Sequence, residues 1–176
     1  MNLQLATGVT SQETLEILTK GAVIGGQRIP LGSNNTFLVH LNAGDGRHVK
    51  AVYKPAAGEQ PLHDFPWKTL YKREYAAYLF AEALGWPRVP PTVIRDGPAG
   101  VGSMQLYIEN NPNVTYFDLV TDHADTLAAF ATFDNLANNA DRKGGHCIRD
   151  KDGTIWSIDH GLTFHVDFKV RTVMLE

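Results

Sequence analysis

Apolar and polar positions alternate in two neighbouring segments of the chain, which is the pattern of half-buried β-strands. The segments are residues 36–41 (TFLVHL) and 48–53 (HVKAVY), and residues 42–47 (NAGDGR) lie between them. Glycine and asparagine accept the positive φ angles that hairpin turns need. Pro55 cannot donate a ladder hydrogen bond, so we expect the second strand to end there. The pattern therefore predicts a β-hairpin that ends close to Lys54.

Three other segments have the pattern of helices. They are residues 11–20, 68–84 and 122–138. Ser11 is a suitable N-cap for the first helix. Gly85 is a suitable C-cap for the second, which has the strongest helical pattern in the chain.

Short β-prone runs complete the pattern, and turns that contain glycine or proline follow them. They occupy residues 92–95, 103–109, 147–149 and 154–158. Strands, a helix, strands, a helix and a closing hairpin follow one another, which is typical of an α+β fold. We expect a β-rich lobe over residues 1–110 and a short, mainly helical lobe over residues 111–176.

Composition excludes several classes of protein. The chain has 176 residues, is 43% hydrophobic and carries a formal net charge of −3, which does not favour nucleic-acid binding driven by charge. The single cysteine, Cys147, cannot form an internal disulfide. The longest apolar run, residues 75–81, is too short to cross a membrane. We expect a cytoplasmic protein without stable membrane insertion.

Glu74 lies on the apolar side of the second predicted helix. At about 100° per residue it lies about 40° from Leu70, close to the middle of the apolar face. A buried carboxylate needs a cationic partner, because burying an unpaired charge costs several kcal/mol. Lys54, at the end of the preceding hairpin, is the partner that we predict. The alternatives are an arginine such as Arg73 for Glu74, and a solvent-exposed position for Lys54.

Two further acids lie in segments rich in polar groups. Asp141 lies in the loop NNADRKGGH, residues 138–146, and Asp159 follows an apolar strand and precedes His160-Gly161. Sites that handle phosphate and Mg²⁺ need several oxygen ligands that converge on one point. Asp159 and a partner from this loop could provide them. A solvated loop would also explain the composition around Asp141.

The order of lysine, helical glutamate, loop aspartate and strand-end aspartate is that of a kinase site. The motifs AVYK (51–54), NNADRKGGH (138–146) and IDHG (158–161) resemble those of atypical kinases. Residues 28–173 resemble a bacterial family of phosphatidylinositol 3-/4-kinase-like proteins, which is related to HipA-type kinases. The resemblance implies a bilobal kinase-like fold with an antiparallel sheet in the first lobe. It also implies ATP and Mg²⁺, or Mn²⁺, as cofactors.

The resemblance implies a role for each site residue. Lys54 would hold the α- and β-phosphates of ATP, and Glu74 would fix its position. The loop GSNNTF (32–37) would cover the phosphates, with Ser33 and Asn34 near the nucleotide. The hinge that binds adenine would contain Gln105, Tyr107 and Ile108.

The remaining roles fall in the second half of the chain. Asp141, followed by Arg142, would be catalytic and would orient or deprotonate the acceptor hydroxyl. Asp159 would bind the metal, and His146 stands where related kinases have a metal-binding asparagine. Imidazole is a poor ligand for Mg²⁺, because hard cations prefer oxygen. This departure raises the alternative of a nucleotide-binding pseudokinase or regulatory module.

The acceptor is predicted to be a protein or a lipid, and the sequence does not choose between them. The chain ends fifteen residues after Gly161, so we expect a shortened C-terminal lobe. Apolar residues near this end, such as Phe168 and Val173, could pack against a second copy of the chain. A third hypothesis is a metal-dependent hydrolase. It requires five side chains to converge, namely Asp141, His146, Asp159, His160 and His165.

Overall fold

The computed structural model describes residues 11–30, 33–44 and 46–175. The chain divides into two compact units. The first unit consists of Met1–Tyr75 and Pro91–Tyr107, and the second of Ala76–Pro90 and Ile108–Glu176. Unlike the single boundary that we predicted after residue 110, this division places a segment from the middle of the chain in the second unit.

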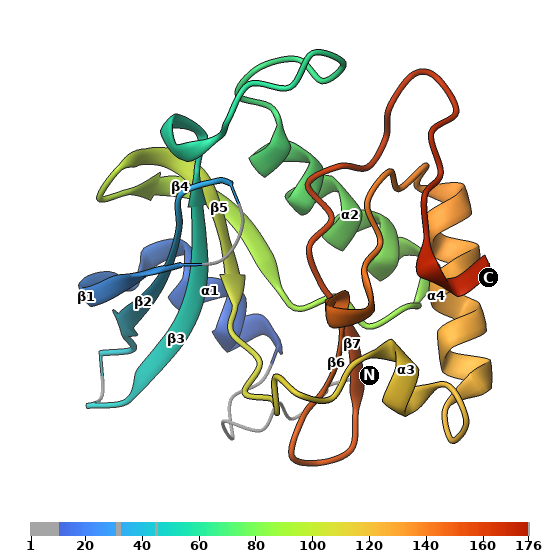
Figure 1. The fold of residues 1–176 in the computed structure, drawn as a ribbon. Coiled ribbons are helices and arrows are strands. Elements are labelled where there is room, and N and C mark those ends of the chain that lie inside the picture. Colours follow the sequence, from blue (N-terminus) through green and yellow to red (C-terminus); the bar gives the residue numbers. More distant parts are fainter. Residues whose placement is uncertain (1–10, 31–32, 45, 176) are drawn as a thin grey trace. The chain divides into compact units, whose positions relative to one another are not determined.

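The first unit is built on a five-stranded antiparallel sheet with the order β1-β2-β3-β5-β4 (Figure 1). Its strands are β1 (Ala22–Ile29), β2 (Thr36–Asn42), β3 (His48–Pro55), β4 (Thr92–Gly97) and β5 (Gly100–Leu106). The predicted hairpin is confirmed as β2 and β3, and β3 ends at Pro55 as expected. The fold of this unit is α+β, because α1 (Ser11–Lys20) packs against β4 and β5.

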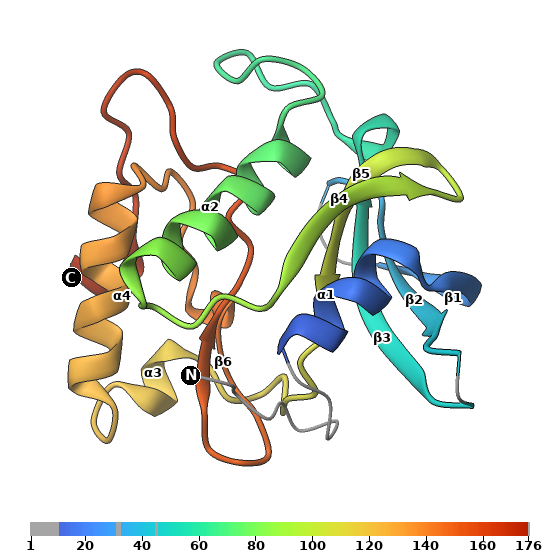
Figure 2. The same ribbon diagram turned by 180° about the vertical axis from the view of Figure 1, so that it is seen from behind.

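Alternation along β3 produces the core of the first unit. Val49, Ala51 and Tyr53 are buried, while the residues between them are partly exposed. At the edge of the sheet, Arg95 in β4 donates to the backbone oxygens of Leu18 (3.1 Å) and Gly21 (2.8 Å). This side chain ties the end of α1 to the sheet. Figure 2 shows α1 lying against the sheet.

β5 begins and ends three residues earlier than the predicted strand, 103–109. The tight turn from Gly97 to Gly100 explains the shift, because it packs directly on Tyr53. A Cβ atom on Gly97 would lie 2.6 Å from the Tyr53 ring, and the Tyr53 hydroxyl donates to the Gly100 backbone oxygen. The turn therefore fixes where β5 starts. Its contact with Tyr53 is tertiary, so the local sequence pattern could not predict it.

The helix α2 (Leu70–Leu84) begins in the first unit and ends in the second. The prediction began it at residue 68, but Lys68 has a φ of +59°, which lies outside the right-handed helical region. At the other end Gly85 has a φ of +77°. Glycine adopts this conformation without a steric cost, so it ends the helix as expected.

The second unit contains the remaining elements, which cover the C-terminal part of the chain. They are α3 (Tyr116–Leu119), α4 (Ala124–Leu136), β6 (Cys147–Arg149) and β7 (Ile155–Ser157), with 3₁₀ turns at Gly144–His146 and Val173–Leu175. The remaining 3₁₀ turn, Ala56–Gly58, lies in the first unit. The prediction missed α3 and started the helix over residues 122–138 two residues early. β6 and β7 form the predicted closing hairpin.

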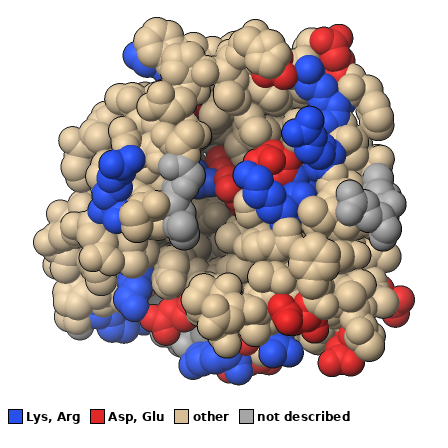
Figure 3. Space-filling view, in the orientation of Figure 1, with Lys and Arg blue, Asp and Glu red and all other residues tan. Residues whose placement is uncertain are grey.

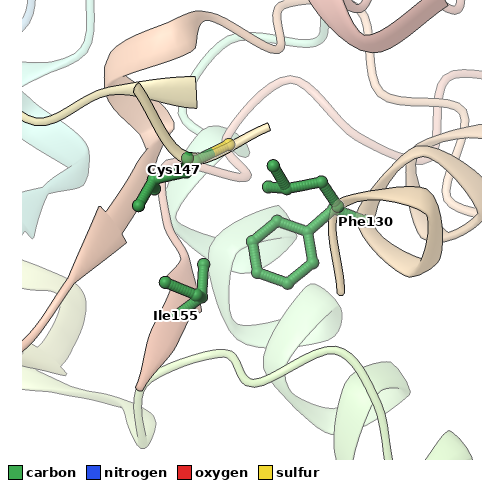
Figure 4. Packing of buried hydrophobic residues seen from close by; sticks show 5 residues of the cluster. Phe130, Cys147 and Ile155 are labelled. Carbon is green, nitrogen blue, oxygen red and sulfur yellow. The ribbon is translucent and has the colours of Figure 1, made fainter. Parts of the chain in front are cut away.

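A hydrophobic cluster joins these elements within the second unit. Its buried members are Leu119, Leu127, Phe130, Cys147 and Ile155, and Figure 4 shows how Phe130 lies beside the last two. The cluster packs α4 against the β6–β7 hairpin. It thereby fixes the two ends of the loop that contains Asp141.

Lysine, arginine, aspartate and glutamate side chains lie interspersed on the face drawn in Figure 3. Among the described residues, no helix is both long and apolar enough to cross a membrane.

Candidate functional site

The first unit contains the predicted ion pair between Lys54 and Glu74. The Lys54 ammonium donates to Oε1 of Glu74. The Glu74 side chain is 3% exposed and that of Lys54 is 24% exposed. The expected partner of the buried carboxylate is therefore present, and Lys54 remains accessible to water.

Local structure explains how the two side chains meet. Lys54 follows Tyr53 in β3, and because successive strand residues face opposite sides, burial of Tyr53 directs Lys54 to the other face. Glu74 lies in the second turn of α2, on the side that contains the buried residues Leu70 and Tyr78. Arg73, the alternative partner, lies over the ring of Phe65 at 4.9 Å.

Ser33 and Asn34 lie between β1 and β2, where the resemblance places a phosphate-covering loop. Ser33 is exposed, and Oδ1 of Asn34 accepts a hydrogen bond from the Gln60 amide at 2.7 Å. The neighbouring Asn35 amide donates to the Gly58 oxygen at 2.9 Å. These bonds tie the segment to the 3₁₀ turn after β3. The nucleotide role of the segment stays a prediction.

The predicted adenine hinge is only partly accessible. Gln105 is buried in β5, between β3 and β4, and its side-chain amide donates to Oγ1 of Thr92 at 2.8 Å. The Tyr107 amide donates to the Lys50 backbone oxygen at 3.0 Å. The Gln105 side chain is therefore used inside the sheet. Ile108, just beyond, is the residue at which the chain enters the second unit again.

Asp141 lies in the loop after α4, as the sequence indicated. Its side chain is 32% exposed, and Oδ2 lies 2.8 Å from Nζ of Lys143. Its backbone amide donates to Oδ1 of Asn139 at 3.1 Å, and Asn139 is wholly buried. A buried asparagine thus holds the backbone of a partly exposed carboxylate.

His146 and Asp159 lie together in the second unit. Nε2 of His146 is 3.3 Å from Oδ2 of Asp159, whose side chain is 49% exposed. Nδ1 of His146 accepts from the Lys143 amide at 3.3 Å, so Nε2 carries the hydrogen and donates to Asp159. Burial lowers the pKa of His146, and the opposing effect of the Asp159 charge is smaller.

Arg142, which we predicted to be catalytic, has a fully buried side chain that pairs with Asp134. Its catalytic role stays a prediction. Nε lies 2.9 Å from Oδ2 of Asp134, and Nη2 lies 2.8 Å from Oδ1. Burial acts to lower the pKa of Arg142, but the hydrogen bonds and charge of Asp134 outweigh it and the pKa is raised. The guanidinium is therefore permanently charged and paired inside the protein.

The sequence prediction missed the other members of this buried group, namely Asp134, Ser157 and His160 as a partner of Arg142. A signal for Asp134 was present. It lies four residues after Phe130 and seven after Leu127 on the apolar side of α4, the same placement that singled out Glu74. A carboxylate there needs a cation just as Glu74 does.

The convergence that the hydrolase hypothesis requires is not found in the part of the chain that the structure describes. No three histidine, cysteine or acidic side chains there form a group that could hold a metal ion. His160 contacts Arg142 at 3.0 Å, and Nδ1 of His165 accepts from the Asp167 amide at 2.9 Å. These histidines serve local hydrogen bonds.

No protein-family model matches the chain. Protein Rv2133c of Mycobacterium tuberculosis is 40% identical over an aligned length of 193 residues, which covers 90% of this chain and 69% of that protein. The chain belongs to the Rv2133c family. The name of this relative states no activity.

Solved structures show a partial match between this Rv2133c-family chain and the kinase-like fold. The kinase CtkA of Helicobacter pylori has a TM-score of 0.56 at 14% identity, and a Golgi casein kinase has 0.55 at 16%. The matches cover 85% and 91% of this chain, which spans only 62% and 60% of the two kinases. At these identities the likeness shows the fold alone.

Proposed function

We propose that the chain is an ATP- and Mg²⁺-dependent phosphotransferase that moves the γ-phosphate to a hydroxyl group of a protein or lipid acceptor. The observation that carries the proposal is the Lys54–Glu74 ion pair, which lies in a chain that partly matches the kinase-like fold. The more specific resemblance to phosphatidylinositol 3-/4-kinase-like proteins agrees with the same motifs and is part of this proposal.

On the nucleotide side, Lys54 would bind the phosphates of ATP. Its ammonium is partly exposed and carries three rotatable donors, which suits phosphate oxygens. The buried Glu74 carboxylate would hold that ammonium in one place. Ser33, Asn34 and the hinge residues would contact the nucleotide through groups that the sheet does not already use.

On the acceptor side, Asp141 would orient the hydroxyl group and accept its proton. The acceptor oxygen forms a bond to the γ-phosphorus while the bond between that phosphorus and the leaving oxygen of ADP breaks. Asp141 is partly exposed, and buried Asn139 holds its backbone. Lys143 lies 2.8 Å from the carboxylate and would have to move aside or contact the phosphate.

The residues of the second unit fit a bound Mg²⁺ through one strong ligand. Asp159 presents a half-exposed carboxylate, which is the ligand type that Mg²⁺ prefers. His146, bonded to the same carboxylate, is a weaker candidate because hard cations prefer oxygen. When bound, the metal would neutralise charge on the phosphates. The role of His146 would then be to direct the Asp159 carboxylate.

The test is ADP release from ATP with Mg²⁺ or Mn²⁺, together with nucleotide binding measured by calorimetry. Lys54→Met should weaken ATP binding, and Asp141→Asn should abolish turnover while ATP still binds. Lys151→Met, the same change in an exposed turn, is the matched control and should leave both unchanged. Absence of ATP binding by the unaltered protein with either metal would refute the proposal.

The pseudokinase alternative rests on His146, which contacts Asp159. Related kinases have a metal-binding asparagine at this position. A nucleotide-binding module would bind ATP through Lys54 and release no ADP with either metal. His146→Asn separates the two functions, because gain of turnover in this variant would identify the histidine as the impairing change.

A further inference from the structure

Arg142 contacts both residues that flank Asp159 in the sequence, the backbone of one and the side chain of the other. Its Nη1 donates to the Ile158 backbone oxygen at 2.8 Å, and its Nη2 lies 3.0 Å from Nε2 of His160. Asp159 itself has a φ of +61°, in the left-handed region that non-glycine residues seldom adopt. A conformation of this kind persists only where its surroundings hold it.

The guanidinium that makes these contacts is itself held by Asp134 in α4. Both carboxylate oxygens accept from it, and Oδ1 also accepts from Nδ2 of Asn139 at 2.8 Å. Asp134, Asn139 and Arg142 are all buried. A planar guanidinium bonded at both ends of a carboxylate cannot rotate freely, so its remaining donors point in fixed directions.

His160 completes the arrangement. A guanidinium only donates, so Nε2 of His160 accepts from Arg142. The same nitrogen lies 2.9 Å from Oγ of Ser157, and the ring meets Phe133 edge-on at 5.6 Å. The residue after Asp159 is therefore fixed by α4 and by β7, while the residue before it is fixed by Arg142.

We propose that Arg142, anchored by Asp134, is a positioning residue that sets the backbone of Asp159 and so the direction of its carboxylate. The importance of this role rests on the proposed function, in which Asp159 binds the metal. Stability alone does not explain the arrangement, because apolar residues of similar size often replace a buried ion pair without loss of stability.

The decisive variant replaces both partners with apolar residues, Asp134→Leu with Arg142→Met. It removes the ion pair without leaving one charge buried alone, so we expect a folded protein with a cooperative unfolding transition. Exchange of the Ile158 amide, which donates to the His146 oxygen at 3.0 Å, should become at least about tenfold faster in the metal-free protein. In the presence of ATP, the apparent Kd for Mn²⁺ should rise about 10- to 100-fold, as for other residues that orient a metal ligand.

Asp150→Asn is the matched control in the same unit. Asp150 accepts from the Trp156 indole and two turn amides, so its loss should lower Tm. It makes none of the described contacts around Asp159, and both the Mn²⁺ affinity and the exchange of Ile158 should stay as in the unaltered protein. A change in the control as large as that in the double variant would reduce the role of Arg142 to general stability and overturn the inference.

Arg142→Lys serves if the double variant does not fold. Lysine keeps the charge but lacks the planar fork, so it should show the same faster exchange and weaker Mn²⁺ binding. Unchanged exchange at Ile158 in a folded variant would overturn the inference. If the unaltered protein binds no Mn²⁺ with ATP, the proposed function fails, and the exchange comparison still decides the positioning role.

Discussion

The two units each contain an acid on the apolar side of a helix, and they pair it in different ways. In the first unit Glu74 meets Lys54, whose side chain is 24% exposed. In the second unit Asp134 meets Arg142, and neither side chain is exposed at all. The first pair therefore keeps one end that a ligand could reach, whereas the second is closed to ligands.

The two pairs also differ in the chemistry of their cations. Lysine is a compact charge whose donors rotate, so it can exchange one anionic partner for another. Arginine bonded through two nitrogens to one carboxylate is fixed, and its other donors fix whatever they contact. Both acids lie on the apolar side of a helix, and the pairs differ in the type and the exposure of the cation.

Breaking the closed pair should have the largest effect. Arg142→Gln leaves the Asp134 carboxylate buried without its cation, which should lower the free energy of unfolding by about 3–5 kcal/mol. Urea unfolding monitored by circular dichroism measures it. Arg149→Gln, at an exposed position on the neighbouring strand, should stay within about 0.5 kcal/mol of the unaltered protein. Equal effects at the two arginines would contradict the comparison.

Breaking the open pair should cost less. Lys54→Met leaves Glu74 buried, but water reaches this end of the pair, so we expect a loss of roughly 1–3 kcal/mol. The same urea experiment measures it, and ATP binding should weaken in parallel. A larger loss of stability than Arg142→Gln causes would show that exposure is not what separates the two pairs.

The stability of the first unit should also depend on alkaline pH through Tyr53. Burial raises the pKa of Tyr53 above 10.0, so the native protein keeps this proton longer than the unfolded chain does. The contribution of Tyr53 to the free energy of unfolding is fully present below pH 10, and it is lost as the pH rises through the raised native pKa. Tyr53→Phe should cost about 1 kcal/mol at pH 7 through the lost hydrogen bond to Gly100. Its urea midpoint should then change less than that of the unaltered protein between pH 9 and pH 11, and parallel curves would refute the assignment.

The smallest expected effect is the labelling of the Cys147 thiol in the second unit. Burial raises the pKa of its thiol to about 12, and the side chain is inaccessible. Ellman's reagent at pH 8 should therefore leave the native protein unlabelled, because the thiolate is the nucleophile. Complete labelling in guanidinium is the control. Rapid labelling of native protein would show that the second unit opens more easily than its buried ion pair implies.

The elements with local causes were predictable from the sequence. Alternation defined β2 and β3, and the helical period placed Glu74 on the apolar face of α2, so the Lys54–Glu74 pair followed from two local patterns. Gly85 marked the end of α2 because its backbone conformation is a property of that residue alone.

The elements with distant causes were not predictable. The start of β5 depends on Tyr53, which precedes Gly100 by 47 residues. The burial of Arg142 depends on Asp134, Ile158 and His160, whose meeting is a tertiary event. The polar loop therefore suggested exposed catalytic groups, although Arg142, one of its three consecutive charged residues, is part of the core.

The register of β3 limits how sequences of this fold can change in length. Tyr53 and Lys54 are adjacent, yet one is in the core and the other carries a partly exposed charge. Inserting or deleting one residue within β3 would exchange their faces, burying the lysine and exposing the ring. The turn before β3 can absorb length changes, whereas β3 itself can only be substituted. Variation in length near Lys54 should therefore be confined to that turn.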